Sequence, residues 1–248
     1  MYVNRRTILG FGLAAASITF IRPVVASGDV VMARVRQTEN RIAERLASGL
    51  AIPAEWTSQA LADGLDERQR RQAAFYLVQR VPYKLTAWTG DPDSLFTLQR
   101  GDCRHKSAAL RRLYRAWGLQ TVAVRVPFDW ADLPIPGSVL SPLDETRGIH
   151  DAIEVRIDGR AVLVDATWDA ALGSIGFPMT GNWDGISPTL AVTQNADIIV
   201  RPNDVPDGTN LYDRFGIAWP VREKTLAFNR AFNAWSDEVR DRFGRMKG

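Results

Sequence analysis

The sequence contains very little cysteine and histidine. Among its 248 residues there is one cysteine, Cys103, and there are two histidines, His105 and His150. A single cysteine cannot form a disulfide within the chain, and without a Cys-x-x-Cys pair the ligand spacing of a structural zinc site is missing. We therefore expect a fold that is stable without bridges, and a function that needs neither a bound metal nor a cofactor.

The sequence also lacks an apolar run of the roughly 20 residues that a membrane-spanning helix requires. The apolar segment 8–21 is shorter than that, follows the pair Arg5 and Arg6, and precedes Val24-Val25-Ala26, which is a small-residue cleavage site. This layout is typical of a bacterial export signal, and the arginine pair indicates the twin-arginine route. We expect residues 1–26 to be removed and the mature protein to be periplasmic or secreted. An uncleaved anchor is the alternative.

An excess of positive charge is missing from the expected mature chain. Residues 1–26 carry three arginines and no acidic residue, so the 31 basic side chains of the full chain fall to 28, against 28 acidic ones. Without a net positive field, the electrostatic basis for nucleic-acid binding is absent.

Internal repeats are absent as well. With 46% hydrophobic residues, the chain is long enough to bury one substantial core, so we expect residues 27–248 to form a single domain.

A helix is predicted immediately around the single cysteine. Residues 102–117 contain no glycine or proline, Gly118 follows where a helix C′ residue belongs, and Asp102 is the expected N-cap. Cys103 then lies in the first turn, on the edge that faces the core. Unpaired backbone N–H groups at a helix start stabilise a thiolate, which is the nucleophilic form of cysteine. A buried, inert thiol is the alternative, because free cysteine is among the most buried residue types.

A thiolate nucleophile needs a base, and only the two histidines are suitable. His105 is two residues after Cys103, about 200° around the helix, so we expect its ring to point away as a surface residue. His150 begins a predicted β-hairpin over residues 150–169, with Asp158-Gly159 as its two-residue turn.

The register of this hairpin brings a carboxylate to the histidine. If Val155 lies opposite Val162, His150 and Asp165 become diagonal neighbours on one face, within side-chain reach. A carboxylate in that place can hold the imidazole tautomer and orient its ring towards Cys103. A β-bulge in the second strand would instead move Asp165 to the other face.

These segments resemble the transglutaminase-like superfamily, whose members are related to the papain-like cysteine peptidases. The resemblance covers about residues 75–170 and is carried by "GDCRHKSAALRRLYRAWGLQTVAVRV", by "HDAIEVRIDGRAVLVDATWD" and, more loosely, by "YLVQRVPYKLTAWTGDPDSLFTLQR". It implies an α+β, papain-like core in which a helix bearing the cysteine packs on an antiparallel sheet, with helical additions at both ends. It also implies that Cys103 is the nucleophile, His150 the general base and acid, and Asp165 the orienting group.

The chemistry that the resemblance implies is acyl transfer through a thioester, on a peptide or protein amide. For the oxyanion site or substrate cleft, the family analogy points to Trp88 or to Gln99, while the backbone N–H of Cys103 is the donor that the helix start itself supplies. The triplet Gly-Asp-Cys continues with basic residues, Arg104 to Lys106, where bacterial transglutaminase-like cysteine peptidases that process surface adhesins usually have acidic ones. The calcium dependence and substrate of those enzymes are therefore not carried over.

The rest of the sequence is predicted to support this core. Amphipathic patterns indicate helices at about 30–50, 66–81 and 221–243, and the last has an apolar stripe that we expect to pack in the core. Residues 127–149 read as a long loop, which we expect to form one wall of the substrate cleft. Residues 170–218 are rich in turns, with the strand candidate "ADIIV" at 196–200.

Several functions stay open at this point. Hydrolysis by a cysteine peptidase or amidase is favoured over transfer to an amine, because water is abundant and no site for a lysine donor is marked. A catalytically silent module that binds peptide or cell wall on the same scaffold is the alternative. The remaining choice, a metal site made by Cys103, His150 and Asp165, lacks paired-ligand spacing. The expected partner is a peptide or protein substrate, with no nucleic acid and no stable membrane insertion.

Overall fold

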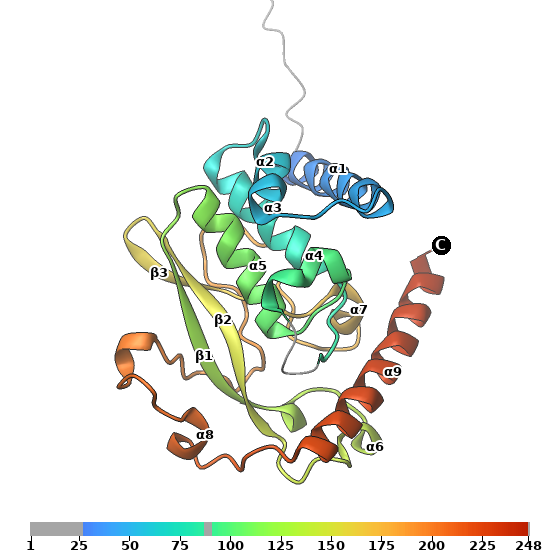
Figure 1. The fold of residues 1–248 in the computed structure, drawn as a ribbon, viewed down its shortest axis with the longest axis vertical. Helices are drawn as coiled ribbons and strands as arrows, with labels where there is room; N and C mark the ends of the chain where they lie inside the picture. The colour runs from blue at the N-terminus through green and yellow to red at the C-terminus, as the bar shows by residue number, and fades with distance from the viewer. Residues whose placement is uncertain (1–26, 87–90, 248) are drawn as a thin grey trace, which may run out of the picture.

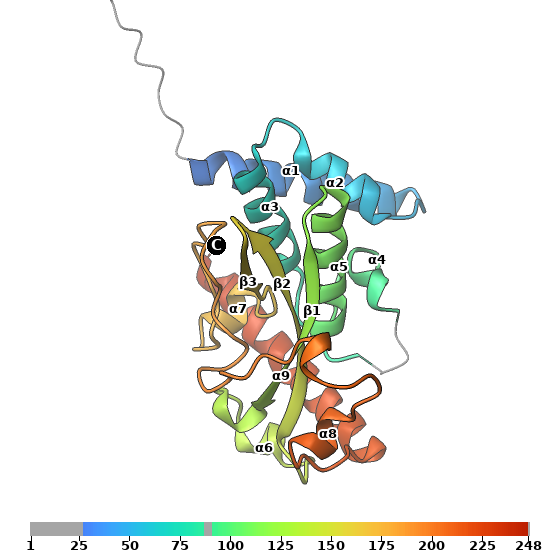
Figure 2. The same ribbon diagram turned by 90° about the vertical axis from the view of Figure 1, so that its left-hand side faces the viewer.

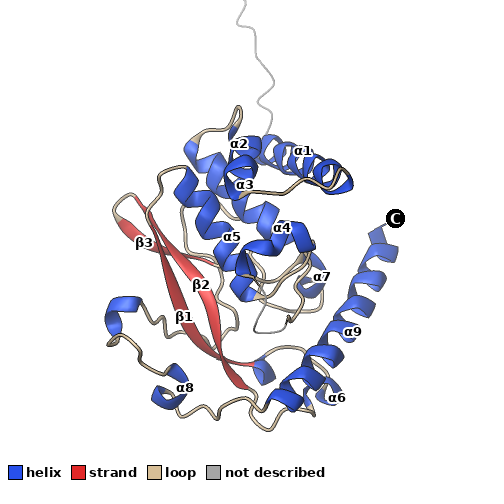
Figure 3. Ribbon diagram, viewed as in Figure 1, coloured by secondary structure: helices blue, strands red, loops and turns tan. Residues whose placement is uncertain are grey.

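The computed structural model describes residues 27–86 and 91–247, which form an α+β fold of helices around a three-stranded antiparallel sheet (Figures 1 and 3). The strands are β1 (Thr121–Asp129), β2 (Arg147–Ile157) and β3 (Arg160–Val164). The helices are α1 (Ser27–Ala47), α2 (Ala54–Ala62), α3 (Glu67–Arg80), α4 (Leu95–Leu98), α5 (Cys103–Ala116), α6 (Gly137–Leu140), α7 (Ala170–Gly173), α8 (Leu211–Arg214) and α9 (Arg222–Lys247).

The sheet has the order β1-β2-β3, so the strand that carries His150 is the central one. The predicted hairpin register is confirmed, because Val155 pairs with Val162 in the β2–β3 ladder. Its turn residues, Asp158 and Gly159, have φ values of 48° and 77°. Two successive positive φ values are the signature of a type I′ turn, whose twist matches that of the flanking strands.

Helix α5 packs on one face of this sheet (Figure 2). Its buried side chains include Leu110, Leu113 and Tyr114, and they share an apolar cluster with Ile153 and Val155 of β2. The predicted ends of this helix are confirmed. Asp102 accepts a hydrogen bond from the Arg104 N–H, and Gly118 has the φ of 78° that favours glycine after a helix.

Helices α1, α2 and α3 gather at the same end of the molecule as the start of β1 (Figures 1 and 2). Two of them were predicted within a few residues, and α3 begins with a reciprocal capping box between Asp66 and Gln69. Helix α2 was not predicted from the sequence. Its N-cap, Pro53, makes no side-chain cap, and nine residues are too few to show a clear period.

Helix α9 lies at the edge of the molecule in Figure 1 and closes a second apolar cluster, as its stripe predicted. Phe228, Phe232 and Val239 are buried in that cluster. The helix is also bonded to the chain that leads from α3 towards α5. The Asn233 amide donates to Leu85 O at 2.9 Å and accepts from Leu85 N at 2.9 Å.

Two predicted segments differ from the structure. Residues 127–149 are not one loop, because β1 continues to Asp129, α6 lies within the segment and β2 begins at Arg147. The ladder between β1 and β2 runs from the pair Thr121–Val155 to the pair Asp129–Arg147, so both ends of the segment belong to the sheet. The strand candidate 196–200 forms only an isolated bridge between Val200 and Arg125, since most of its residues have no neighbouring strand to pair with.

Within residues 27–86 and 91–247, no helix combines the length and the apolar character needed to cross a bilayer. The predicted export signal, with Arg5 and Arg6, lies outside the described residues.

Candidate active site

The structure brings the three predicted residues together. Cys103 is the first residue of α5, His150 lies on β2, and Asp165 directly follows β3. His150 Nε2 is 2.8 Å from Asp165 Oδ2, and the Cys103 thiol lies close enough to the His150 side chain for each group to shift the pKa of the other. Because Nε2 is engaged by the carboxylate, Nδ1 is the ring nitrogen left for the sulfur. Sulfur, imidazole and carboxylate therefore follow one another in this order.

The carboxylate of this chain is held by its own neighbours. Asp165 Oδ1 accepts a hydrogen bond from the Thr167 N–H at 3.0 Å, while the Asp165 N–H donates to Thr189 Oγ1 at 2.8 Å. Its other oxygen is thereby left to face His150. A carboxylate fixed in this way sets the orientation of the imidazole ring and stabilises its protonated form.

The pKa of His150 is raised from its ordinary value to about 10. Burial by itself lowers this pKa, but the charge and hydrogen bond of Asp165, together with the Cys103 side chain, outweigh it. The same ion pair acts on its partner. Burial raises the pKa of Asp165, yet the His150 charge and hydrogen bond leave it below the ordinary value.

The pKa of the Cys103 thiol is raised. Burial of the sulfur is the largest cause, whereas the hydrogen bond and charge of His150 lower the pKa, and the Asp151 and Asp102 carboxylates raise it further. From the sequence, only the position of Cys103 at the start of a helix could be predicted, and that position favours the thiolate. The surrounding protein removes water from the sulfur, and that effect is the stronger one.

The prediction for His105 is wrong. Its side chain is fully buried, and its Nδ1 lies 2.8 Å from Asp102 Oδ1. The aspartate that caps the helix thus also binds this ring, while Thr86 Oγ1 donates to the other carboxylate oxygen at 2.6 Å. The fit leaves no space beside it, because a Cβ added at Gly101 would lie 2.6 Å from the His105 Cβ. His105 belongs to the support of the site.

A buried lysine of the site was not predicted from the sequence. Lys106 is only 1% exposed, and its Nζ donates to Gln79 O at 3.1 Å and to Ala166 O at 3.3 Å. It thereby ties α3 and α5 to the backbone next to Asp165. Burial lowers the pKa of Lys106 to about 7, although the charges of Asp169 and Asp165 oppose this. The sequence does contain one signal for this lysine. Lys106 follows Cys103 by three residues, and residues three apart on a helix lie on the same face.

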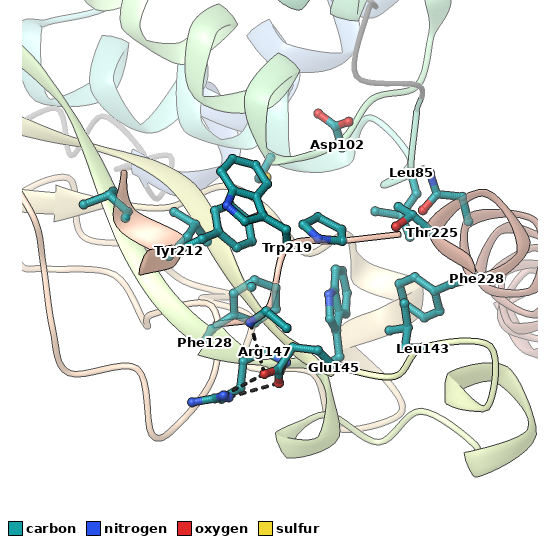
Figure 4. A pocket seen from close by; sticks show the side chains of 18 of the residues that line it. Leu85, Asp102, Phe128, Leu143, Glu145, Arg147, Tyr212, Trp219, Thr225 and Phe228 are labelled. Carbon is teal, nitrogen blue, oxygen red and sulfur yellow. Dashed lines mark hydrogen bonds and ion pairs between the residues drawn. The ribbon is translucent and has the colours of Figure 1, made fainter. Parts of the chain in front are cut away.

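A cleft of about 800 Å³ opens over Cys103 (Figure 4). Much of its lining is aromatic or aliphatic. The predicted segment 127–149 does contribute a wall, through Phe128 and Trp130 at one end and Leu143 to Ile149 at the other. The opposite wall comes from α9 and from residues 209–221, a segment that was predicted only as turns.

Two aromatic rings of this second wall are stacked. Tyr212 and Trp219 have ring centroids 4.8 Å apart and an interplanar angle of 17° (Figure 4). Trp219 nevertheless remains 62% exposed. Burial raises the pKa of Tyr212, and the charges of Cys103 and Asp151 raise it further.

Of the two predicted oxyanion or cleft residues, Gln99 is not brought to this cleft. Gln99 is exposed in a left-handed turn with φ 52°, and its amide donates to Phe96 O at 2.6 Å within the same turn. It is not among the residues that line the cleft. Trp88 lies outside the described residues. In the described ranges, no group of three or more histidine, cysteine, aspartate or glutamate side chains is arranged to hold a metal ion.

No protein-family model matches the chain, and no curated protein matches it with significant similarity.

Proposed function

We propose that this protein is a thiol-dependent acyl-transfer enzyme that acts on peptide or protein amides. The observation that supports it best is the hydrogen-bonded pair of His150 and Asp165 beside the Cys103 thiol, which lines a large cleft. The cysteine begins a helix, the histidine lies on the central strand of an antiparallel sheet, and the aspartate follows the next strand. This arrangement supports a transglutaminase-like core.

In the proposed reaction, the Cys103 thiolate attacks the carbonyl carbon of the amide and forms a tetrahedral intermediate. The backbone N–H of Cys103, at the open start of α5, is placed to stabilise the oxyanion. The His150 imidazolium then gives its proton to the leaving amine as the C–N bond breaks, which leaves a thioester. A water molecule, deprotonated by His150, attacks the thioester and releases the acid and the thiol.

The pKa shifts define the protonation state from which this reaction starts. Burial disfavours the thiolate, and Asp165 favours the imidazolium, so the resting pair holds one proton more than attack requires. Loss of that proton gives the reactive thiolate–imidazolium form. Turnover should accordingly increase as the pH is raised through the pKa of the pair.

We favour hydrolysis over transfer to an amine. The cleft is open and wide, so water reaches the thioester without a dedicated channel. The export predicted from residues 1–26 would put the proposed substrate outside the cytoplasm, among periplasmic or secreted proteins.

A catalytically silent peptide-binding module is the second candidate. The raised pKa of the Cys103 thiol favours it, because a thiol that stays protonated is a poor nucleophile. In that case the aromatic cleft would hold a peptide without cleaving it.

Turnover by active-site variants separates these two functions. The mature protein would be incubated with a peptide library, and the products would be identified by mass spectrometry. We expect cleavage by the wild type, none by Cys103→Ala, and a loss of at least ~100-fold for His150→Asn, in line with removal of a general base. Ser107→Ala, one turn further along α5 and outside the cleft lining, is the control that should retain activity. Unchanged turnover in both active-site variants would exclude the proposed enzyme.

A further inference from the structure

We propose that the cleft selects an uncharged substrate segment with a bulky apolar or aromatic side chain, which packs against the stacked pair of Tyr212 and Trp219. This inference rests on the proposed function for its reaction. The binding preference itself follows from the walls of the cleft, and it can be measured independently of turnover.

The first support is the continuity of the aromatic wall. Phe128 and Trp130 meet edge to face with centroids 4.9 Å apart, and Trp130 meets Phe228 of α9 in the same manner at 5.2 Å. The rings fix one another in place, so the wall presents a preformed apolar surface. Preformed apolar pockets bind apolar groups without the cost of ordering side chains.

The second support is the exposure of Trp219. A tryptophan that is 62% exposed leaves a large apolar surface in water, although its ring is already stacked on Tyr212. In Figure 4 the ring of Trp219 lies over the cleft. A substrate side chain that covers this ring would remove apolar surface from water on both partners, which is the main driving force for such contacts.

The third support is that the charges lining the cleft are already engaged with one another. Arg147 forms a two-point ion pair with Glu145, at 2.6 and 3.0 Å. The other pairs are Lys224 with Asp144, Arg125 with Asp151, and Arg104 with Asp102. Each acidic side chain of the cleft thus has a basic partner from the same cleft. A charged substrate side chain would have to break one of these pairs or lose its hydration without compensation.

The fourth support is the way in which the aromatic pair is held. The segment between Tyr212 and Trp219 is bonded to β2 and its leading turn by Arg147 Nη2, which donates to Gly216 O at 2.8 Å. The Ala218 N–H donates to Glu145 Oε2 at 3.5 Å. The hydrogen bond and charge of Arg147 lower the pKa of Glu145 to about 2, so this carboxylate stays ionised at neutral pH. The pair of Arg147 and Glu145 therefore leaves no net charge at its place in the cleft, and it holds the segment that carries Trp219.

The test uses three alkylating probes that carry different side chains: the chloromethyl ketones of acetyl-phenylalanine, acetyl-alanine and acetyl-aspartate. In each reaction the Cys103 thiolate displaces chloride and forms a C–S bond. Second-order rate constants would be divided by the rate constant for iodoacetamide, which has no side chain. We expect the phenylalanine probe to react at least ~10-fold faster than the alanine probe, as filling an apolar pocket warrants, and the aspartate probe to react slowest.

Variants of the aromatic pair locate the preference. In Trp219→Ala, the ratio of the phenylalanine to the alanine rate, each divided by the iodoacetamide rate of the same variant, should fall to ~3 or less, because the apolar surface is lost. Trp219→Leu, which keeps apolar bulk, should give an intermediate ratio. Leu190→Ala is the control, since Leu190 is 54% exposed and lies outside the cleft lining.

Equal wild-type rates for the phenylalanine and alanine probes would overturn the inference, and so would a preference that survives in Trp219→Ala. The outcome is separable from that of the proposed function. If the protein cleaves no peptide but shows the Trp219-dependent preference, this binding site is supported and the proposed function fails. If it cleaves peptides without a side-chain preference, the proposed function is supported and this binding site fails.

Discussion

His150 and Lys106 are both fully buried, and their pKa values are shifted in opposite directions. The folded chain keeps His150 protonated up to about pH 10, whereas burial leaves Lys106 half-neutral at about pH 7. Above pH 7, folding therefore takes up a proton at His150 and releases one at Lys106. The two contributions to the pH dependence of stability have opposite signs.

Replacing either residue should expose the contribution of the other. Relative to the wild type, the free energy of unfolding of Lys106→Met should fall between pH 7 and 8.5, by up to about 1.4 kcal/mol per pH unit. That of His150→Asn should rise with pH over the same window, since its raised pKa no longer contributes. Urea unfolding at pH 7.0, 7.75 and 8.5 measures both slopes. Slopes identical to that of the wild type would contradict the buried charge states.

Thiol reactivity gives a second test of the role of His150. The hydrogen bond and charge of His150 lower the pKa of Cys103, so their removal should raise it further. At pH 7 the alkylation of His150→Asn by iodoacetamide should be slower than that of the wild type, by about tenfold for each unit by which the thiol pKa rises. Stopped-time mass measurements give the rate, with Ser107→Ala as control. An equal or faster reaction would show that His150 does not assist the thiol.

Sequence reasoning succeeded for single residues where a strict period decides the position. The two-residue repeat of a strand placed His150 and Asp165 on one face, and the helix start placed Cys103 at its cap. It failed for His105 and Lys106, whose positions depend on which backbone and carboxylate groups lie around the helix. The spacing of Lys106 from Cys103 indicates a shared helix face, but it does not identify the groups that surround the lysine.

At the level of elements, the best-predicted parts carry their own local signals. The β2–β3 hairpin has its turn dipeptide, α5 and α3 have capping side chains, and α9 has a long apolar stripe. Helix α2 and the short pieces between β1 and β2 have no such signals. Elements that short are stabilised by packing against neighbours, so the sequence of the segment alone does not specify them.

The hairpin turn allows a test of whether its two residues fix the backbone conformation of the turn. Gly159 has φ 77°, and a Cβ added there would meet only open space, so Gly159→Ala adds backbone strain and no steric clash. We expect a loss of about 1 kcal/mol in the free energy of unfolding. Gly137 has similar open space without a positive φ, and Gly137→Ala is the matched control, expected to be neutral or slightly stabilising. Equal effects of the two changes in urea unfolding would argue against the type I′ turn.

For the whole molecule, a partly buried ion pair joins α9 to the site. Arg240 Nη2 donates to Asp169 Oδ2 and to Tyr83 O, both at 2.7 Å, and Asp169 also accepts from the Tyr83 N–H at 2.9 Å. Tyr83 in turn lines the cleft. This cluster connects three segments that are far apart in the sequence, and no sequence pattern indicated it.

Breaking this pair should destabilise the whole fold. Arg240→Met leaves the Asp169 carboxylate buried without its ion partner, and we expect a loss of about 3–5 kcal/mol in the free energy of unfolding. Arg242→Met, an exposed position on the same helix, should change it by less than about 0.5 kcal/mol. Thermal and urea unfolding measure both variants. A small effect of Arg240→Met would mean that this ion pair contributes little to holding α9 in place.

Helix α9 also has a consequence for the order in which the molecule is built. It supplies Phe228 to the cleft and bonds to Leu85 and Tyr83, which flank the thiol. A ribosome makes Cys103, His150 and Asp165 well before it makes this helix. The cleft over Cys103 therefore lacks the part of its wall that α9 provides until this helix has been made and has docked.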